Sequence, residues 1–224
     1  MPDITMICLA NSRKIGGRCV AGLAWDGERY SNWVRPISPY GSGELYTERL
    51  YSDRSDPQLL DVIMFDSIAP RPSGCHVEDV LVNRDKAWQK IGSTTYSEVS
   101  RLASSSTAPL WADGGHTTYG TNDSIDATTA SSLQSSLRLI VPDMLILRAA
   151  AEGWANRRKV RGEFSLGTTA YVLAVTDPRI ETEFAALDVG STRTLEKPLL
   201  CISISELFEA QNAHYKLIAG VVEA

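Results

Sequence analysis

The stretch "ICLANSRKIGGRCVAG", residues 7–22, carries the strongest fold signal in the chain. Two apolar runs flank a polar Asn-Ser-Arg-Lys corner and a Gly-Gly pair, a pattern typical of two antiparallel strands joined by a tight turn. Gly16 and Gly17 suit such a turn because glycine adopts positive φ without steric cost. The sequence therefore predicts a β-hairpin here, with a cation-rich corner between its strands.

Strand signals recur along the rest of the chain, bounded by glycine and proline. Two further segments have capping residues and helical spacing, which indicate short helices. Each half of the chain is thus predicted to be strand-rich with one short helix, which favours a mostly β fold of small sheets or barrels. The strands are expected within residues 29–38, 59–70, 137–147, 159–178, 199–207 and 215–222, and the helices within 95–104 and 178–187.

The segment 104–136 is rich in Ser, Thr, Gly and Asp and separates the two strand-rich halves. A polar segment of this length is typical of a linker or of a functional loop. A chain of 224 residues suits one large domain or two of roughly 100 residues each. We therefore predict an N-terminal barrel over residues 1–110, a polar loop over 111–135 and a C-terminal barrel over 136–224.

Composition and charge indicate a globular protein and argue against a disordered, a nucleic-acid-coating or a membrane-spanning chain. With 43% hydrophobic and 22% charged residues, the chain can build a core and is not a disordered polymer. Its net charge of −5 argues against non-specific coating of nucleic acid, although a local basic groove is compatible with it. No apolar run is long enough to span a membrane and no secretory signal is visible, so we expect a cytoplasmic location without a membrane partner.

The four cysteines lack the paired spacing of a metal site. Cys8, Cys19, Cys75 and Cys201 are scattered, and no Cys/His quartet at ligand spacing accompanies them. Reduced and mostly buried thiols are the simplest interpretation for a cytoplasmic protein. The sequence predicts neither a metal site nor a cofactor.

Several segments, taken in order, resemble the dual OB-fold domain family of bacteria. They are "CLANSRKIGGRCVAG", "WVRPIS", "LLDVIMF", "NDSI", "YVLAVTDP" and "YKLIAGVV", and they extend over nearly the whole chain. The N-terminal corner and the "WVRP" motif are the most specific part of the resemblance. The resemblance implies two tandem five-stranded OB-like barrels packed together. It further implies binding of nucleic acid or a nucleotide-like ligand, in a setting of defence against phage.

The corner of the first hairpin offers side-chain donors, cations and two permissive glycines. Such a turn could present N–H groups and positive charges to a phosphate, yet any polar Gly-Gly hairpin has a similar composition. No Walker A pattern is present. On local grounds a simple turn is favoured, and the family resemblance raises a ligand site to near parity. The corner residues of that site are Asn11, Ser12, Lys14 and Arg18.

Trp33 and Arg35 are two residues apart on a predicted strand, so they face the same side of its sheet. An aromatic ring beside a guanidinium is what a single-stranded nucleic acid needs for stacking and phosphate contact. Alternatively, Trp33 belongs to the core and Arg35 forms a salt bridge at its rim. We favour a binding role for Arg35, because an arginine drawn into the core would need a partner.

The densest basic cluster lies in "WANRRKVRGEF", residues 154–164. A basic edge beside Trp154 could follow a phosphate backbone, although such a charge run is more often a solvated face or the protection of a strand edge. Nucleic-acid contact is therefore the minority interpretation of this cluster. Its cations are Arg157, Arg158, Lys159 and Arg161.

Two places could support catalysis instead. Cys8 lies near cations that could activate its thiol, but the three histidines are remote in sequence, and packing is the better explanation. The polar loop places His116 and Asp123 close in sequence without the spacing of a metal or acid–base motif. A linker that uses Asn and Asp for turns is the better explanation of that loop.

The leading prediction is a binding module for single-stranded nucleic acid or a small nucleotide ligand, with no catalytic residue assigned. An enzyme acting on a nucleotide or nucleic acid through Cys8 or the His116/Asp123 loop is the alternative. A protein–protein adaptor that uses an apolar patch or a strand edge is the second alternative. The predicted ligand site comprises Asn11, Ser12, Lys14, Arg18, Trp33 and Arg35.

Overall fold

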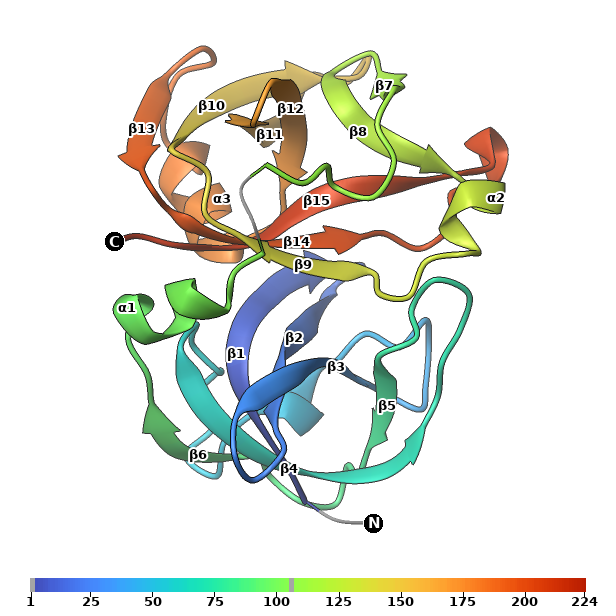
Figure 1. Cartoon of the computed structure of the whole chain (residues 1–224), viewed down its shortest axis with the longest axis vertical. Helices are drawn as coiled ribbons and strands as arrows, with labels where there is room; N and C mark the ends of the chain where they lie inside the picture. The colour runs from blue at the N-terminus through green and yellow to red at the C-terminus, as the bar shows by residue number, and fades with distance from the viewer. Residues whose placement is uncertain (1–2, 105–106) are drawn as a thin grey trace. The chain divides into compact units, whose positions relative to one another are not determined.

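A computed structural model describes residues 3–104 and 107–224 of the chain (Figure 1). The described chain is mostly β, with short helices between its strands. It divides into two compact units, residues 1–102 and residues 103–224. Each unit contains a buried apolar cluster of its own. Each is therefore described by itself.

The first unit is a closed barrel of five strands. β1 pairs with β2, β2 with β3, β3 with β5 and β5 with β4, and β4 returns to β1 to close the ring. The β3–β5 pairing is parallel and the others are antiparallel, as in the five-stranded Greek-key barrel of an OB fold. The elements of this unit are β1 (Asp3–Lys14), β2 (Gly17–Trp25), β3 (Tyr30–Ile37), η1 (Thr47–Arg49), β4 (Asp61–Pro70), β5 (Asp79–Val82), β6 (Gln89–Ser93), α1 (Tyr96–Val99) and η2 (Ser100–Leu102).

The predicted N-terminal hairpin is present as β1 and β2, with Lys14 opposite Gly17. The turn residues with positive φ are Ile15 and Gly16, not the Gly-Gly pair that the sequence suggested. Gly17 instead lies in β2, where an added Cβ atom would approach the Leu45 carbonyl oxygen to 2.8 Å. Glycine is thus required at position 17 by close packing rather than by the conformation of the turn.

The second unit is a single sheet of nine strands with short helices. Its strands follow the order β13-β10-β11-β12-β8-β15-β14-β9, and β7 pairs with β8. Its elements are β7 (Gly115–Thr117), β8 (Gly120–Asp126), α2 (Ala127–Ala130), β9 (Leu137–Ile140), β10 (Met144–Glu152), β11 (Arg157–Leu166), β12 (Thr169–Val175), α3 (Pro178–Ala185), β13 (Thr192–Glu196), β14 (Leu199–Ile204), η3 (Glu209–Gln211) and β15 (Ala213–Val222).

The second unit repeats the pairing order of the first. β10, β11 and β12 form an antiparallel meander, β12 pairs in parallel with β15, and β15 pairs with β14. β13 pairs with β10, and only Lys197 and Pro198 separate it from β14. In the first unit the single strand β4 corresponds to both β13 and β14. Its first half pairs with β1 and its second half pairs with β5. The predicted mostly β fold of two OB-like barrels is confirmed, although the sequence shows no clear repeat.

The segment predicted as a polar inter-barrel loop, residues 111–135, contains regular structure. It holds β7, β8 and α2 of the second unit, and the boundary between the units falls after Leu102. Leu110 belongs to the buried cluster of this unit, and Trp111 packs against that cluster. Short strands rich in Ser, Thr and Gly escape a search for apolar alternation, which is why the segment resembled a linker.

Both predicted helices are present. Thr95 and Glu98 form a capping box at the start of α1, and the Asp177 side chain caps α3, which has Pro178 in its first turn. Among the described residues, no helix combines the length and the apolar character needed to cross a membrane.

Candidate nucleic-acid interface

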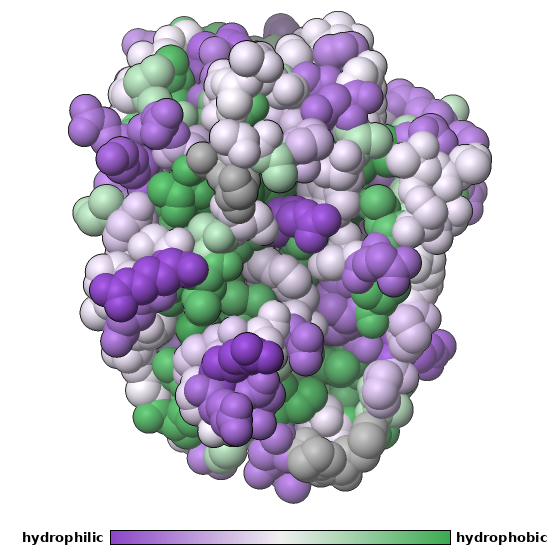
Figure 2. Space-filling model, in the orientation of Figure 1, coloured by the Kyte–Doolittle hydropathy of each residue, from purple (hydrophilic) through white to green (hydrophobic). Residues whose placement is uncertain are grey.

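The tip of the β10–β11 hairpin is a candidate site because it carries an exposed tryptophan, Trp154. On the face shown in Figure 2, apolar residues are scattered among hydrophilic ones, so hydropathy alone marks no single site. Trp154, at the hairpin tip, is 98% exposed, whereas the other exposed tryptophan of the described chain, Trp25, is 42% exposed. Tryptophan is usually buried over most of its surface. A fully exposed indole is therefore a candidate contact for a flat ligand.

The hairpin tip is held by hydrogen bonds on both sides. Glu152 and Arg157 are its last paired residues, and the Asn156 N–H donates to the Gly153 carbonyl over 3.0 Å. Gly153 and Asn156 have positive φ, which glycine and asparagine tolerate best. The Gly153 N–H also donates to the Tyr119 hydroxyl over 3.0 Å. The tip is therefore anchored to the turn between β7 and β8.

Cations follow the exposed indole along β11. Arg157 and Arg158 are exposed, and Lys159 is half-buried. Arg158 donates through Nη1 to the Leu187 carbonyl, which holds its side chain along the surface. Three consecutive cations thus lie next to the hairpin tip. We call Tyr119, Trp154, Arg157, Arg158 and Lys159 the hairpin surface.

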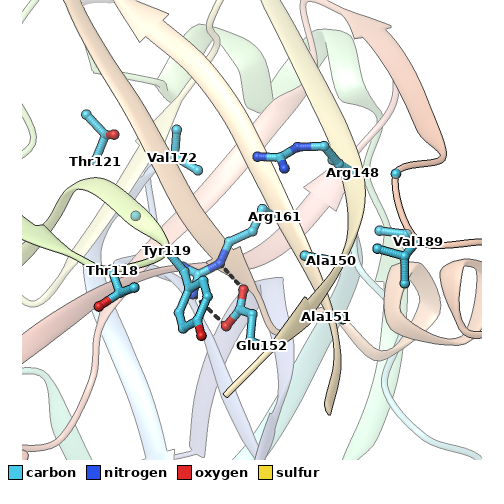
Figure 3. Close-up of a pocket in the computed structure, with 13 residues that line it drawn as sticks. Thr118, Tyr119, Thr121, Arg148, Ala150, Ala151, Glu152, Arg161, Val172 and Val189 are labelled. Atoms are coloured by element: carbon cyan, nitrogen blue, oxygen red, sulfur yellow. Dashed lines mark hydrogen bonds and ion pairs between the residues drawn. The ribbon is translucent and has the colours of Figure 1, made fainter. Parts of the chain in front are cut away.

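Arg161, the fourth cation of the predicted basic cluster, has a structural role. It is 8% exposed, and its Nε and Nη2 donate to the two carboxylate oxygens of Glu152 over 2.6 and 2.9 Å (Figure 3). The Asp123 carboxylate lies 3.8 Å from its Nη1. From the sequence, nucleic-acid contact is the minority interpretation for Arg161. In the structure its guanidinium pairs with the half-buried Glu152 on the opposite strand of the same hairpin and lies near the buried Asp123.

A cavity of about 460 Å³ adjoins this ion pair (Figure 3). Tyr119 and Arg148 line it, and the small side chains of Ala149, Ala150 and Ala151 on β10 leave the space open. Its volume falls in the range of small-molecule sites. Sequence reasoning missed Tyr119 because the residue lies in the segment interpreted as a linker, and the only signal was an aromatic residue inside a Thr- and Gly-rich turn.

The predicted corner residues of the first hairpin are tied into the first unit. Ser12 is buried, while Asn11, Lys14 and Arg18 are half-buried. Ligand contact by this corner stays a prediction. A ligand would have to compete with the hydrogen bonds that these side chains make within the first unit. The hydrogen bonds run from Asn11 to Asp56 over 2.9 Å, from Ser12 to the Cys19 carbonyl over 3.4 Å and from Lys14 to the Ser42 carbonyl.

Arg35 lies inside the protein rather than on an open platform. It is 3% exposed, and its Nε and Nη2 donate to the Asp79 carboxylate over 2.6 and 2.9 Å. Asp79 stands opposite it because β3 and β5 pair in parallel with these two residues in register. Trp33, on the same strand, is half-buried. This placement agrees with the alternative that Arg35 forms a salt bridge. Arg35 is not one of the residues of the hairpin surface.

The two places considered for catalysis are occupied by structural contacts. Cys8 is fully buried. The exposed His116 accepts at Nδ1 from the Asn122 N–H over 3.2 Å, whereas the buried Asp123 accepts from the N–H and hydroxyl of Thr117 over 2.9 and 2.6 Å. Within the described residues, no group of three or more His, Cys, Asp and Glu side chains is arranged to hold a metal ion.

A buried lysine fixes the start of the polar segment. Lys216 is 1% exposed, donates to the Ala112 carbonyl over 2.5 Å and lies 5.4 Å from the centre of the Tyr171 ring. The Tyr171 hydroxyl donates to Asp113 over 2.7 Å and accepts from the Leu110 N–H over 3.0 Å. Burial lowers the pKa of Lys216, and the Asp113 carboxylate opposes that shift.

Lys216→Met should change how the stability of the protein depends on pH. The folded-state pKa of Lys216 is below its usual value of 10.5, so between these two pKa values the unfolded chain binds more protons than the folded one. The free energy of unfolding of the wild type should therefore rise with pH in that window, relative to Lys216→Met. Denaturant melts of both proteins from about pH 7 to about pH 10 measure the difference, and parallel profiles would contradict it.

Comparison with known proteins agrees with this architecture. Residues 4–221 match the family described as "Dual OB-containing domain". No curated protein and no solved structure matches the chain. The matched residues extend over both units, each of which has the strand pairing of an OB-like barrel. The chain therefore belongs to the dual OB-containing domain family.

Proposed function

We propose that this protein binds single-stranded nucleic acid through the hairpin surface of its second unit. OB-fold barrels commonly bind oligonucleotides, and the loop between their first two strands is one of the loops that they use. The β10–β11 hairpin occupies that place in the second unit. The fully exposed Trp154 at its tip is the observation that carries the proposal.

The hairpin surface offers the groups that a single strand needs. A base can stack on an exposed indole, and each stacked base contributes about 1–3 kcal/mol. Arg157 and Arg158 can neutralise phosphates next to that base. A duplex hides the faces of its bases, so an exposed indole favours a single strand. The chain as a whole has a net charge of −5, so we expect a local contact rather than coating of long nucleic acid.

Fluorescence anisotropy with labelled single strands of about 12 nucleotides, a length within the range of OB-fold sites, tests the proposal. DNA and RNA oligomers are titrated separately over a series of salt concentrations. Affinity should fall with added salt, and the slope of log K against log salt should lose roughly 0.7 for each phosphate contact removed. The variant Arg157→Ala/Arg158→Ala should therefore bind more weakly and with a flatter salt dependence.

A matched pair of arginines in the first unit provides the control. Arg29→Ala/Arg71→Ala removes the same charge from exposed positions outside the hairpin surface. Its affinity and salt slope should stay close to those of the wild type. Equal losses in the two double variants would mean that net charge alone matters, and no measurable binding by the wild type would refute the proposal.

A nucleotide-sized ligand is the narrower form of the same proposal. The cavity beside Tyr119 has a volume of about 460 Å³, and Tyr119 and Arg148 are among the residues that line it. Competition of mononucleotides against the labelled strand distinguishes the two forms. The anti-phage setting implied by the family resemblance stays a prediction.

A further inference from the structure

The loop between β14 and β15 carries a second group of exposed apolar side chains in the second unit. Leu207 and Phe208 are consecutive in the chain and are 42% and 48% exposed. Glu206 and Glu209 flank them and are also exposed. An exposed apolar patch with a polar rim is typical of a surface that binds another protein. We call these four residues the acidic loop.

Backbone hydrogen bonds hold the acidic loop in place. The Phe208 N–H donates to the Ala213 carbonyl over 2.8 Å, and the Ser205 N–H donates to the Tyr215 carbonyl over 2.8 Å. The ring centres of Phe208 and Tyr215 lie 6.1 Å apart. The exposed side chains are therefore presented by an ordered loop, which lowers the conformational entropy that would be lost when a partner binds.

Negative charge predominates around the acidic loop. Residues 198–215 contain no lysine or arginine. The exposed Asp126 lies beside this segment, because it stands opposite Ala213 in the pairing of β8 with β15. The hairpin surface, in contrast, contains three consecutive cations next to its exposed indole. The second unit thus has two aromatic surfaces of opposite charge, which are electrostatically complementary to each other.

The two surfaces lie at opposite ends of β8 (Figure 1). The hairpin tip is anchored to Tyr119, directly before β8 begins, whereas the acidic loop leads into β15 beside Asp126, where β8 ends. A strand of seven residues is about 20 Å long. The acidic loop therefore does not reach the hairpin surface of its own copy, but its exposed side chains are accessible to that of another copy.

We propose that copies of this protein associate head to tail, with the hairpin surface of one copy bound to the acidic loop of the next. Trp154 packs against Leu207 and Phe208 at the centre of the contact, where tryptophan is commonly found in interfaces. The arginines of the hairpin surface face Glu206 and Glu209 at its rim. Each pair of copies keeps one surface of each kind unused, so association can continue beyond a dimer. The contact is small, and we expect it to be weak and sensitive to salt.

Analytical ultracentrifugation of the full-length chain tests the association from about 10 µM to about 1 mM, a range that suits a weak contact. The weight-average mass should rise above that of the monomer with protein concentration and fall back with added salt. Glu206→Arg/Glu209→Arg makes both surfaces basic, and Arg157→Glu/Arg158→Glu makes both acidic. All four positions are exposed, so both variants should fold, and each alone should stay monomeric.

An equimolar mixture of the two charge-reversed variants should associate again. The unchanged hairpin surface of one variant complements the unchanged acidic loop of the other, and the two reversed surfaces also complement each other. Arg29→Glu/Arg71→Glu is the control, since it changes the net charge equally at exposed positions of the first unit and should associate like the wild type. The proposal is overturned if the wild type stays monomeric, if either reversed variant associates like the wild type, or if their mixture stays monomeric.

This association does not rest on nucleic-acid binding, and the two proposals can fail separately. A chain that associates but binds no single strand would refute only the proposed function. A strand of about 12 nucleotides that binds the hairpin surface should return the protein to the monomer, because it occupies the same cations. Association that persists while the strand is bound would overturn docking of the acidic loop on the hairpin surface.

Discussion

Trp154→Ala should lower the affinity for single-stranded DNA by about 5- to 150-fold, the equivalent of one lost base stack worth about 1–3 kcal/mol. The side chain is 98% exposed and packs against nothing that the fold needs, so the stability of the variant should match the wild type. Anisotropy titrations and thermal melts of the same preparations measure the two properties. Trp154→Phe should recover part of the affinity, because a smaller ring still stacks.

Trp25 provides the matched control for this prediction. It is 42% exposed at the end of β2 and packs against Tyr30 with the rings tilted and their centres 4.9 Å apart. Trp25→Ala removes the same type of side chain from the first unit, and the affinity should change by less than about threefold. If both variants lose affinity equally, or if Trp154→Ala binds like the wild type, the base does not stack at the hairpin tip.

The outline of the fold could be predicted because the strongest strands are locally encoded. The N-terminal hairpin shows its two apolar runs and its turn within residues 7–22, and β4 is visible as a continuous apolar segment. β6 could not be predicted in this way, because all five of its residues are exposed and show no alternation. β7 and β8 were hidden for a similar reason, since hydroxyl, glycine and other polar residues fill most of their positions.

The candidate interface could be predicted only in part. The basic cluster beside Trp154 is visible in the sequence, but exposure decides which of its members face a ligand, and exposure depends on partners distant in the chain. Arg161 is buried because Glu152 and Asp123 surround its guanidinium. Arg35 shows the same effect, since its partner Asp79 is 44 residues away. Sequence reasoning noted that a buried Arg35 would need a partner, but it could not locate one.

Asp79→Ala should destabilise the folded protein by about 3–5 kcal/mol, the second large effect that we expect. Asp79 and Arg35 have side chains only 5% and 4% exposed, and two hydrogen bonds join them. Removing the carboxylate leaves the buried, charged guanidinium of Arg35 without its Asp79 partner, and burying a charge without its partner lowers the free energy of unfolding. Urea melts followed by tryptophan fluorescence measure the loss. Glu223→Ala, which breaks the exposed pair with Arg193, should cost less than about 1 kcal/mol.

The double variant Arg35→Met/Asp79→Leu separates stability from ligand contact at this position. Replacing both charges with apolar side chains should restore most of the stability lost in Asp79→Ala, because no buried charge is then left without its partner. If Arg35 only stabilises the first barrel, this stable double variant binds single-stranded DNA like the wild type, whereas Asp79→Ala loses binding only as it unfolds. If a folded double variant loses affinity, Arg35 contributes to ligand binding. If Asp79→Ala is as stable as the wild type, the buried Arg35–Asp79 pair does not stabilise the fold as predicted.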